Sequence, residues 1–353
     1  MSKKPLRVAV AGCGDVAQTK HLPHWKELAD EGRVELASVC DIIPGRADAS
    51  RDKFGADKAF TDFSEMIDYA DYDVLDVCTQ NRLHAPMTID GLKAGANVLV
   101  EKPMAMNVRE AQKMIKTAET AGRKLMVAQY MRFEGHSELL KKAVDAGELG
   151  DIYTGRTYWM RRRGIPGWGK FHIAAESLGG PLIDIGVHML DLCLWLMGSP
   201  VPVAASGKVY RKFGDRKDLV NPEWGVPYPA GEFDVEDYAT AFIRFENGVT
   251  LTTDFSWAAN IPDEVEGLSI LGDKGGISTN PLGIYSAEYG TVTRKSFDFV
   301  PEQYGHRGAI RHFVECVEKD KQVLVRPEES LRVQKIIDAI YESSDKNKEI
   351  NIK

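Results

Sequence analysis

The N-terminal part of the chain, 6–130, alternates short apolar runs with longer amphipathic stretches, and this alternation restricts the fold more than any other feature. The runs are almost continuously apolar, which is typical of parallel strands buried on both faces. They span 6–12, 34–41, 73–79, 97–102 and 124–130, with a shorter run at 58–62. The segments 16–31, 44–54, 84–95 and 107–121 between them have helical spacing. This order predicts right-handed crossover units and a Rossmann-type, doubly wound parallel sheet.

After about residue 130 the pattern changes. A helix is predicted at 136–147, a strand at 150–163 and a strongly apolar helix at 181–197. The pattern of residues 239–258 predicts a β-hairpin with Asn247-Gly248 at its turn, and strand-like runs follow to about residue 300. Two more helices are predicted at 306–319 and 328–343. We therefore expect an α/β fold with two domains, residues 1–130 and 131–353, the second built on a large, mainly antiparallel open sheet.

Length and charge limit the class of protein. A chain of 353 residues is long enough for about two domains. Its content of 43% hydrophobic and 27% charged residues is typical of a soluble globular protein that can bury hydrophobic cores. The net charge of −7, with no basic tract beyond residues 161–163, argues against nucleic acid or an anionic membrane as a partner. The apolar run near the start is too short for a signal or spanning helix. Five dispersed cysteines without a C-x-x-C favour a reduced, cytoplasmic chain without disulfides or structural zinc.

A G-x-G-x-x-A motif joins the first predicted strand to the first helix. It consists of Gly12, Cys13, Gly14, Asp15, Val16 and Ala17. In this context the first glycine permits a tight turn, the second lets the backbone approach a pyrophosphate, and the small alanine allows helix and strand to pack closely. The helix N-terminus then offers free N–H groups to the anion. A glycine-rich turn without a ligand is the alternative, and the position of the motif favours a dinucleotide.

An acidic residue, Asp41, ends the second predicted strand, downstream of the glycine motif. A carboxylate there can accept hydrogen bonds from the hydroxyls of the adenosine ribose and would repel a 2′-phosphate. Arg46 is the nearest cation that follows it. NAD is therefore the predicted cofactor, with NADP as the alternative.

Three polar side chains follow the strand at 73–79. Thr79, Asn81 and His84 lie at its carboxyl end, where open α/β sheets bind ligands. They can line the cofactor, and Asn81 and His84 can also cap the following helix. The two roles are compatible.

The apolar run at 97–102 ends on Glu101 and Lys102, followed by Pro103. Burying a charged side chain costs free energy unless the charge is paired with an opposite charge or takes part in binding or catalysis. At the end of a strand beside the nicotinamide, Lys102 can hydrogen-bond the reacting oxygen, and Glu101 can orient the ribose or amide of the nicotinamide. Pro103 stiffens the turn, and the bond before it is a candidate for the cis form. A solvated strand end is the simpler alternative.

The apolar helix at 181–197 carries three ionisable residues on one face. Asp184, His188 and Asp191 stand at i, i+4 and i+7. They form either a polar network in the core, or a metal site, or a catalytic relay with His188 as general base, Asp191 orienting it and Asp184 holding a substrate hydroxyl. A metal is the weakest of these because no third ligand stands nearby in the sequence.

A Gly/Pro loop at 158–176 is rich in aromatic and basic residues. Aromatic faces stack on sugar rings, and arginine binds hydroxyls or carboxylates. Arg163, Trp168 and His172 are its candidate substrate contacts, with Tyr130 and Trp257 as weaker ones. Packing of the tryptophans within the loop is the competing interpretation.

Taken together, these motifs resemble the Gfo/Idh/MocA oxidoreductases, the glucose–fructose oxidoreductase and inositol dehydrogenase group. The resemblance rests on AGCGDVA, VCD, Glu101-Lys102-Pro103, Arg132-Phe133 and GGPLIDIGVHMLDL, and covers nearly the whole chain. It implies a Rossmann domain, an open-sheet C-terminal domain, dimers or tetramers through that sheet, and oxidation of a sugar, cyclitol or polyol alcohol with NAD or NADP. Lys102, Asp184 and His188 are the implied catalytic trio. The chain departs from the family pattern at Gln80 and Pro181.

Three functions remain open from the sequence. The first is a sugar or polyol dehydrogenase. The second is a glycoside-cleaving enzyme that uses tightly held NAD for transient oxidation and elimination. The third is a dinucleotide-binding sensor without catalysis, which the ionisable stripe of the 181–197 helix disfavours.

Overall fold

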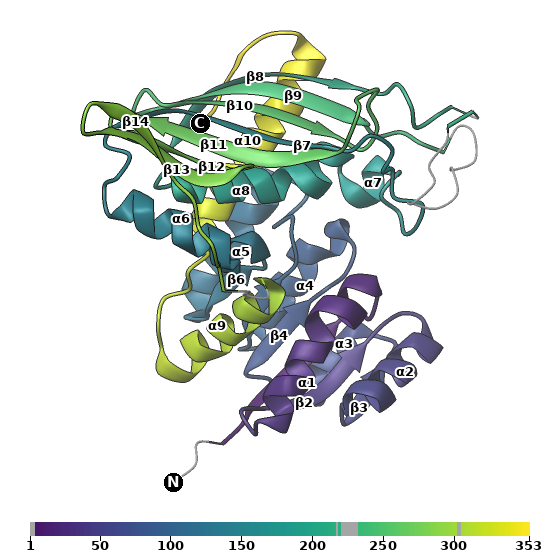
Figure 1. Cartoon of the computed structure of the whole chain (residues 1–353). Helices are drawn as coiled ribbons and strands as arrows, with labels where there is room; N and C mark the ends of the chain where they lie inside the picture. Colours follow the sequence, from purple (N-terminus) through teal and green to yellow (C-terminus); the bar gives the residue numbers. More distant parts are fainter. Residues whose placement is uncertain (1–3, 217, 220–231, 302–304) are drawn as a thin grey trace. The chain divides into compact units, whose positions relative to one another are not determined.

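The computed structural model describes residues 4–216, 218–219, 232–301 and 305–353, and the chain divides into two compact units. The first unit comprises Met1–Phe133 and Gln303–Leu331, and the second Glu134–Glu302 and Arg332–Lys353. Figure 1 shows the elements of both.

The first unit holds a six-stranded parallel sheet with the order β3-β2-β1-β4-β5-β6. Its strands are β1 (Leu6–Ala11), β2 (Val34–Cys40), β3 (Lys58–Phe60), β4 (Val74–Val77), β5 (Asn97–Val100) and β6 (Leu125–Val127). The strand order reverses between β1 and β4, which is the switch point of a doubly wound sheet. The central strands are buried along their whole length, as their continuous apolar runs predict. The predicted Rossmann-type sheet is confirmed.

Helices connect these strands as predicted, with one local difference. They are α1 (Leu22–Asp30), α2 (Pro44–Phe54), α3 (Phe63–Tyr69), α4 (Asn81–Lys93) and α5 (Val108–Ala121), and a 3-10 turn η2 (Tyr130–Phe133) follows β6. The predicted helix at 16–31 begins instead with a π-helical segment, η1 (Ala17–His21). Such segments are rare and often lie at functional sites.

The chain returns to the first unit near its C-terminus, where the sequence predicts a single domain over 131–353. Helix α9 (Gly305–Lys319) buries Ala309, Ile310 and Phe313 in the same apolar core as β1 and β5. The division at residues 1–130 and 131–353 therefore differs from the structure, because the amphipathic face of α9 completes the core of the first unit.

The second unit contains a nine-stranded sheet, β14-β13-β12-β11-β7-β10-β9-β8-β15. The strands are β7 (Ile152–Met160), β8 (Pro202–Tyr210), β9 (Tyr238–Phe245), β10 (Thr250–Ser256), β11 (Val265–Gly272), β12 (Gly275–Thr279), β13 (Leu282–Glu288), β14 (Thr291–Lys295) and β15 (Ile350–Asn351). All neighbours pair antiparallel except β7 and β10. The sheet is thus mainly antiparallel, as predicted, and β9 and β10 form the expected hairpin.

The helices of the second unit include the one that carries the ionisable stripe. They are α6 (Gly135–Asp145), α7 (Ala174–Ser177), η3 (Leu182–Gly186), α8 (Val187–Leu196) and α10 (Pro327–Lys346), whose first turn belongs to the other unit. Figure 1 shows α6 and α8 on one side of the sheet.

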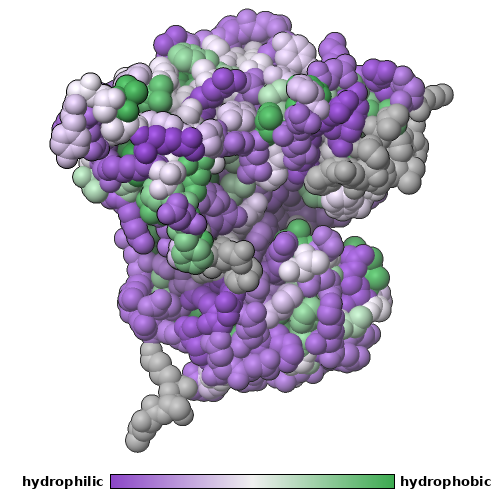
Figure 2. Space-filling model, in the orientation of Figure 1, coloured by the Kyte–Doolittle hydropathy of each residue, from purple (hydrophilic) through white to green (hydrophobic). Residues whose placement is uncertain are grey.

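Among the described residues, one helical run, Ala174–Leu196, is long and apolar enough to cross a membrane by length and composition alone. Its most apolar window is 89% buried inside the chain, as in the core helix of a globular unit. Figure 2 shows that polar residues cover most of the visible face, while apolar residues form small separate patches.

Candidate active site

The glycine motif forms a tight turn at the carboxyl end of β1. Gly12 has a φ of +93°, and a Cβ at this position would lie 2.4 Å from the carbonyl oxygen of Cys78. Gly12 is therefore required by both conformation and space. A Cβ at Gly14 would meet nothing within 4 Å, so the start of η1 is open to a ligand from that side. Ala17 is fully buried, whereas Asp15 and Val16 are exposed.

The carboxylate of Asp41 organises this turn. Its Oδ2 accepts the N–H of Cys13 at 3.0 Å, and its Oδ1 accepts the N–H of Ile43 at 2.9 Å. Arg46 approaches Oδ2 at 3.4 Å. Oδ1 keeps capacity for a further hydrogen bond, so the residue can hold the glycine loop and also receive a ribose hydroxyl.

The residues after β4 divide into two kinds. The hydroxyl oxygen of Thr79 is buried and has no hydrogen-bond partner within the described chain, so a ligand can provide one. Asn81 is the first residue of α4, while Gln80 precedes the helix without a side-chain cap. His84 is fully buried, with Nδ1 2.7 Å from the carbonyl oxygen of Pro103 and Nε2 3.0 Å from that of Thr79. Burial lowers the pKa of His84 against the opposing effect of the two carbonyl contacts, and the ring lies between two backbone segments.

The turn after β5 is held from several sides. The bond between Lys102 and Pro103 is cis, as the sequence suggested, and the carbonyl of Pro103 faces His84. Glu101 is only 6% exposed, and its Oε2 accepts the backbone N–H of Lys102 at 3.2 Å. The strand end is thus not a solvated one: Lys102 is half-buried, and the backbone around it is hydrogen-bonded.

Behind this turn lies a buried cluster that the sequence reasoning missed. The two nitrogens of His21 contact the carboxylates of Asp76 and Glu101, Trp25 donates to Asp76, and His306 lies close to Glu101. One local signal was present, because Asp76 interrupts the apolar run of β4. His21 and His306 carried no such signal, since their contacts join segments distant in the sequence.

The predicted stripe lies in the second unit, on a helix that is not a uniform α-helix. Asp184 belongs to the π-helical η3, whereas His188 and Asp191 belong to α8. His188 and Asp191 are buried, and Asp184 is half-buried. The indole N–H of Trp257, a fully buried residue, donates to Oδ2 of Asp184 at 3.0 Å. Trp257 thereby fixes one oxygen of the carboxylate.

A buried glutamate anchors the start of η3. Glu236 accepts the N–H groups of Gly180 and Leu182 at 2.9 and 3.1 Å, and the hydroxyl of Tyr341 at 2.9 Å. Burial raises the pKa of Glu236 to about 7, against the opposing effect of these hydrogen bonds. A Cβ at Gly180 would lie 1.9 Å from the carbonyl oxygen of Glu236, so the close approach requires glycine. The sequence reasoning did not identify this anchor.

The predicted substrate contacts fall into different environments. Arg163 donates to the carbonyl of Ala259 at 2.8 Å and to Asn260 at 2.7 Å, so its guanidinium holds its own loop. Trp168 is 47% exposed, whereas His172 is buried and burial lowers its pKa. Tyr130 belongs to the first unit and stacks on His306 with ring centroids 4.2 Å apart.

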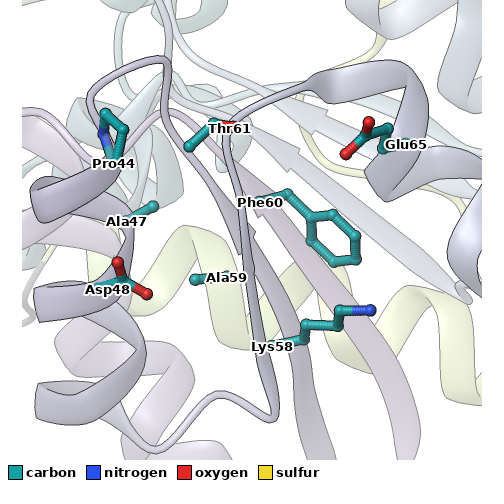
Figure 3. Close-up of a pocket in the computed structure, with 8 residues that line it drawn as sticks. All are labelled: Pro44, Ala47, Asp48, Lys58, Ala59, Phe60, Thr61 and Glu65. Atoms are coloured by element: carbon teal, nitrogen blue, oxygen red, sulfur yellow. The ribbon is translucent and has the colours of Figure 1, made fainter.

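Figure 3 shows a hollow of the first unit beside β3. It is lined by Pro44, Ala47, Asp48, Lys58, Ala59, Phe60, Thr61 and Glu65. None of these is a predicted site residue.

Comparison with known proteins agrees with this arrangement. Residues 6–129 match the profile of the oxidoreductase family with an NAD-binding Rossmann fold, and residues 138–278 match the GFO/IDH/MocA C-terminal domain. The chain belongs to the GFO/IDH/MocA oxidoreductase family. Its N-terminal unit is accordingly the NAD-binding Rossmann domain of an oxidoreductase, and the resemblance noted from the motifs is confirmed.

Several GFO/IDH/MocA relatives have assigned activities. The chain is 32% identical over 346 residues to the D-glucoside 3-dehydrogenase of Escherichia coli K12, covering 98% of this chain and 97% of the relative. It is 27% identical over 272 residues to the myo-inositol 2-dehydrogenase of Thermotoga maritima, covering 77% and 74%. Among solved structures, a levoglucosan dehydrogenase in complex with NADH has a TM-score of 0.83 at 21% identity, covering 99% of each chain, which shows the fold.

Proposed function

We propose that this oxidoreductase is an NAD(P)-dependent dehydrogenase that transfers a hydride between a secondary alcohol of a sugar, glycoside or cyclitol and nicotinamide. The observation that carries the proposal is the similarity to a D-glucoside 3-dehydrogenase over 98% of the chain. A D-glucoside is therefore the first substrate to test, and oxidation at C3 the first position.

The residues of the first unit fit a dinucleotide. The open start of η1 and the turn at Gly12 suit a pyrophosphate, Asp41 suits the adenosine ribose, and the unsatisfied hydroxyl of Thr79 suits the nicotinamide half. The proposed cofactor-binding residues are Gly12, Gly14, Asp15, Val16, Ala17, Asp41, Arg46, Thr79, Asn81, His84, Glu101 and Lys102. His84 contributes to the cofactor site indirectly, because its ring contacts the backbone carbonyls of Pro103 and Thr79. We expect NAD to be preferred over NADP because Asp41 is held in place by two N–H groups.

The catalytic roles follow from the chemistry of three side chains. When bound, the cofactor supplies the hydride acceptor. His188 takes the hydroxyl proton of the substrate as general base. The ammonium group of Lys102 donates a hydrogen bond to the same oxygen and stabilises its developing negative charge. Asp184, fixed through Trp257, accepts a hydrogen bond from a substrate hydroxyl, and Asp191 orients His188.

Further contacts with the carbohydrate are proposed for Tyr130, Arg163, Trp168 and His172. Trp168 is the best candidate among these residues, because its large exposed ring can stack on the C–H face of a sugar. Arg163 supports the loop that carries Trp168, since its hydrogen bonds already go to Ala259 and Asn260.

We also propose a cytoplasmic homodimer or homotetramer that assembles through the nine-stranded sheet. Alternate residues of β9, such as Thr240 and Phe242, are half-buried while their neighbours are buried, so one face of this strand is only partly covered. Sedimentation or light scattering of the purified protein tests the oligomer.

A substrate panel tests the proposed reaction. Reduced nicotinamide is followed by absorbance over D-glucosides, free sugars and cyclitols with NAD and with NADP. We expect turnover of at least one secondary alcohol, and a loss of several orders of magnitude in Lys102→Met and His188→Ala. Glycoside cleavage without added NAD and without net NADH would instead support transient oxidation with elimination. A panel without turnover or cleavage, together with unchanged NADH binding in both variants, would support a sensor.

A further inference from the structure

The buried cluster next to Lys102 consists of three ionisable side chains, those of His21, Asp76 and Glu101. His21 and Asp76 are fully buried and Glu101 nearly so. His21 Nδ1 lies 2.8 Å from Oδ2 of Asp76, and His21 Nε2 lies 2.9 Å from Oε1 of Glu101. The three side chains come from η1, β4 and the end of β5, and all belong to the first unit.

The geometry favours the protonated state of His21. A neutral imidazole has one N–H and one acceptor nitrogen, so it can donate to only one of two carboxylates. Both ring nitrogens of His21 face carboxylate oxygens at hydrogen-bond distance, and only the doubly protonated imidazolium can donate to both carboxylates at once. Burial lowers the pKa of His21, but the interactions with Asp76, together with those of Cys78, outweigh burial and raise the pKa well above its usual value.

The carboxylates respond to the same cation. Burial raises the pKa of Glu101, but the hydrogen bond and charge of His21 override it and lower the pKa to about 2. The indole of Trp25 donates to Asp76 at 2.6 Å, and the thiol of Cys78 lies 3.5 Å from its other oxygen. The array therefore contains two carboxylates and one imidazolium.

The other groups around the cluster do not replace the charge of His21. His306, from α9, lies 3.9 Å from Glu101, and burial lowers its pKa to about 3, so it is neutral at physiological pH. His24 and Lys20 act on His306 through their charge, and the side chain of Lys102 acts likewise on Glu101. Among these neighbours, only His21 makes hydrogen bonds to both carboxylates.

We propose that His21 is a positioning residue for hydride transfer: as an imidazolium it orients the Glu101 carboxylate, which accepts the backbone N–H of Lys102 and so aligns the amine of that residue. The chain of contacts runs from Asp76 through His21 and Glu101 to the backbone N–H of Lys102, the last at 3.2 Å. This proposal rests on the function proposed above, because it takes Lys102 to be catalytic.

Two alternatives make different predictions. A purely structural network could be replaced by apolar residues, because buried ion pairs often stabilise a fold no more than packed side chains do. A metal site is also conceivable geometrically, since ligand atoms of His21, Glu101 and His306 lie within 4.8 Å of one another. A metal-binding nitrogen carries no proton, however, so the two states of His21 can be distinguished directly.

The first test requires no substrate. The ring nitrogens of His21 are observed by ¹⁵N NMR in the wild-type enzyme with NADH bound, from pH 6 to pH 8. We expect both nitrogens to stay protonated throughout. A neutral ring at pH 7, or a stoichiometric metal ion in the purified protein, would overturn the proposal whatever the substrate proves to be.

The second test separates positioning from folding. In His21→Gln we expect kcat, normalised to NADH-binding sites, to fall about 10- to 100-fold while the Kd for NADH changes less than about threefold. Adding Asp76→Asn removes one of the two carboxylates that lose their cation in His21→Gln, and it should recover part of kcat and of the melting temperature. The control His24→Gln changes a neighbouring histidine on the adjoining turn, whose Nδ1 lies 3.5 Å from Glu27, and it should match wild type.

The outcomes distinguish this proposal from the proposed function. If Lys102→Met is inactive while the normalised kcat of His21→Gln equals that of wild type, only the positioning role of His21 is overturned. Full activity in Lys102→Met would refute the catalytic mechanism on which the positioning role depends. If His21→Gln does not fold, the NMR experiment on the wild-type protein still decides the protonation state.

Discussion

Replacing Gly12 with alanine should damage both the stability of the Rossmann unit and its binding of NADH. The added Cβ would lie 2.4 Å from the carbonyl oxygen of Cys78 and 2.6 Å from its carbonyl carbon, both backbone atoms at the end of β4. These atoms cannot rotate away, because the N–H of Cys78 is bonded to the carbonyl of Ala11 at 2.7 Å. The glycine turn must therefore move away from β4.

The cost can be worked out from two contributions. An L-residue with a φ of +93° costs about 1–2 kcal/mol, and forcing a methyl group into a packed site costs about 1–3 kcal/mol. The sum of about 2–5 kcal/mol corresponds to a drop in melting temperature of roughly 4–20 °C for a unit of this size. Because the displaced turn carries the proposed phosphate site, the Kd for NADH should rise at least tenfold.

Gly14→Ala and Gly45→Ala are matched controls, because a Cβ at either position meets nothing within 4 Å and neither has positive φ. Thermal melting and NADH fluorescence titration of all three variants separate the effects. We expect Gly14→Ala to melt like wild type but bind NADH at least tenfold more weakly, and Gly45→Ala to be normal in both. A Gly12→Ala protein as stable as wild type would refute the strain argument. Normal NADH binding in Gly14→Ala would refute the pyrophosphate cradle.

Three further predictions concern other parts of the site. In Asp41→Ala, the ratio of the Kd for NADPH to the Kd for NADH should fall at least tenfold in a fluorescence titration. The carboxylate that repels a 2′-phosphate is then absent, and Arg46, which lies 3.4 Å from that carboxylate in the wild type, can bind the phosphate. An unchanged ratio would contradict this prediction. Trp257→Phe removes the 3.0 Å hydrogen bond to Asp184, a charge-assisted bond of about 1.5–3 kcal/mol, so kcat/KM should fall about 10- to 100-fold with NADH affinity unchanged. Burial raises the pKa of Glu236 to about 7 from 4.5, so its contribution to stability is fully present below pH 4.5 and is lost as the pH rises through 7. The melting temperature of Glu236→Gln should accordingly depend less on pH between 5 and 8 than that of wild type, and parallel curves would show that the carboxyl is ionised throughout.

Much of the first unit could be predicted because its signals are local. The glycine motif, the buried strands and the acidic end of β2 each depend on residues adjacent in the chain, and the structure places Asp41 against the glycine turn as that pattern implies. The stripe of Asp184, His188 and Asp191 was also visible, since helical spacing brings nearby residues to one face.

Other features could not be predicted because they depend on contacts between distant segments. The indole that fixes Asp184 comes from Trp257, and the glutamate that anchors η3 is Glu236, both from far along the chain. Helix α9 has an ordinary amphipathic pattern, which indicates a buried face but not which core buries it. The π-helical segments η1 and η3 likewise leave no mark in the spacing of apolar residues.

The amino-acid sequence by itself determined the family, the parallel sheet and the dinucleotide turn, because each is encoded in short-range patterns of size, polarity and spacing. Only the tertiary structure decided how the charged end of β5 is accommodated. There His21 and Asp76, from η1 and β4, meet Glu101 out of water, and the short contacts between opposite charges favour the protonated imidazole of His21 and the ionised carboxylate of Glu101 against the effect of burial.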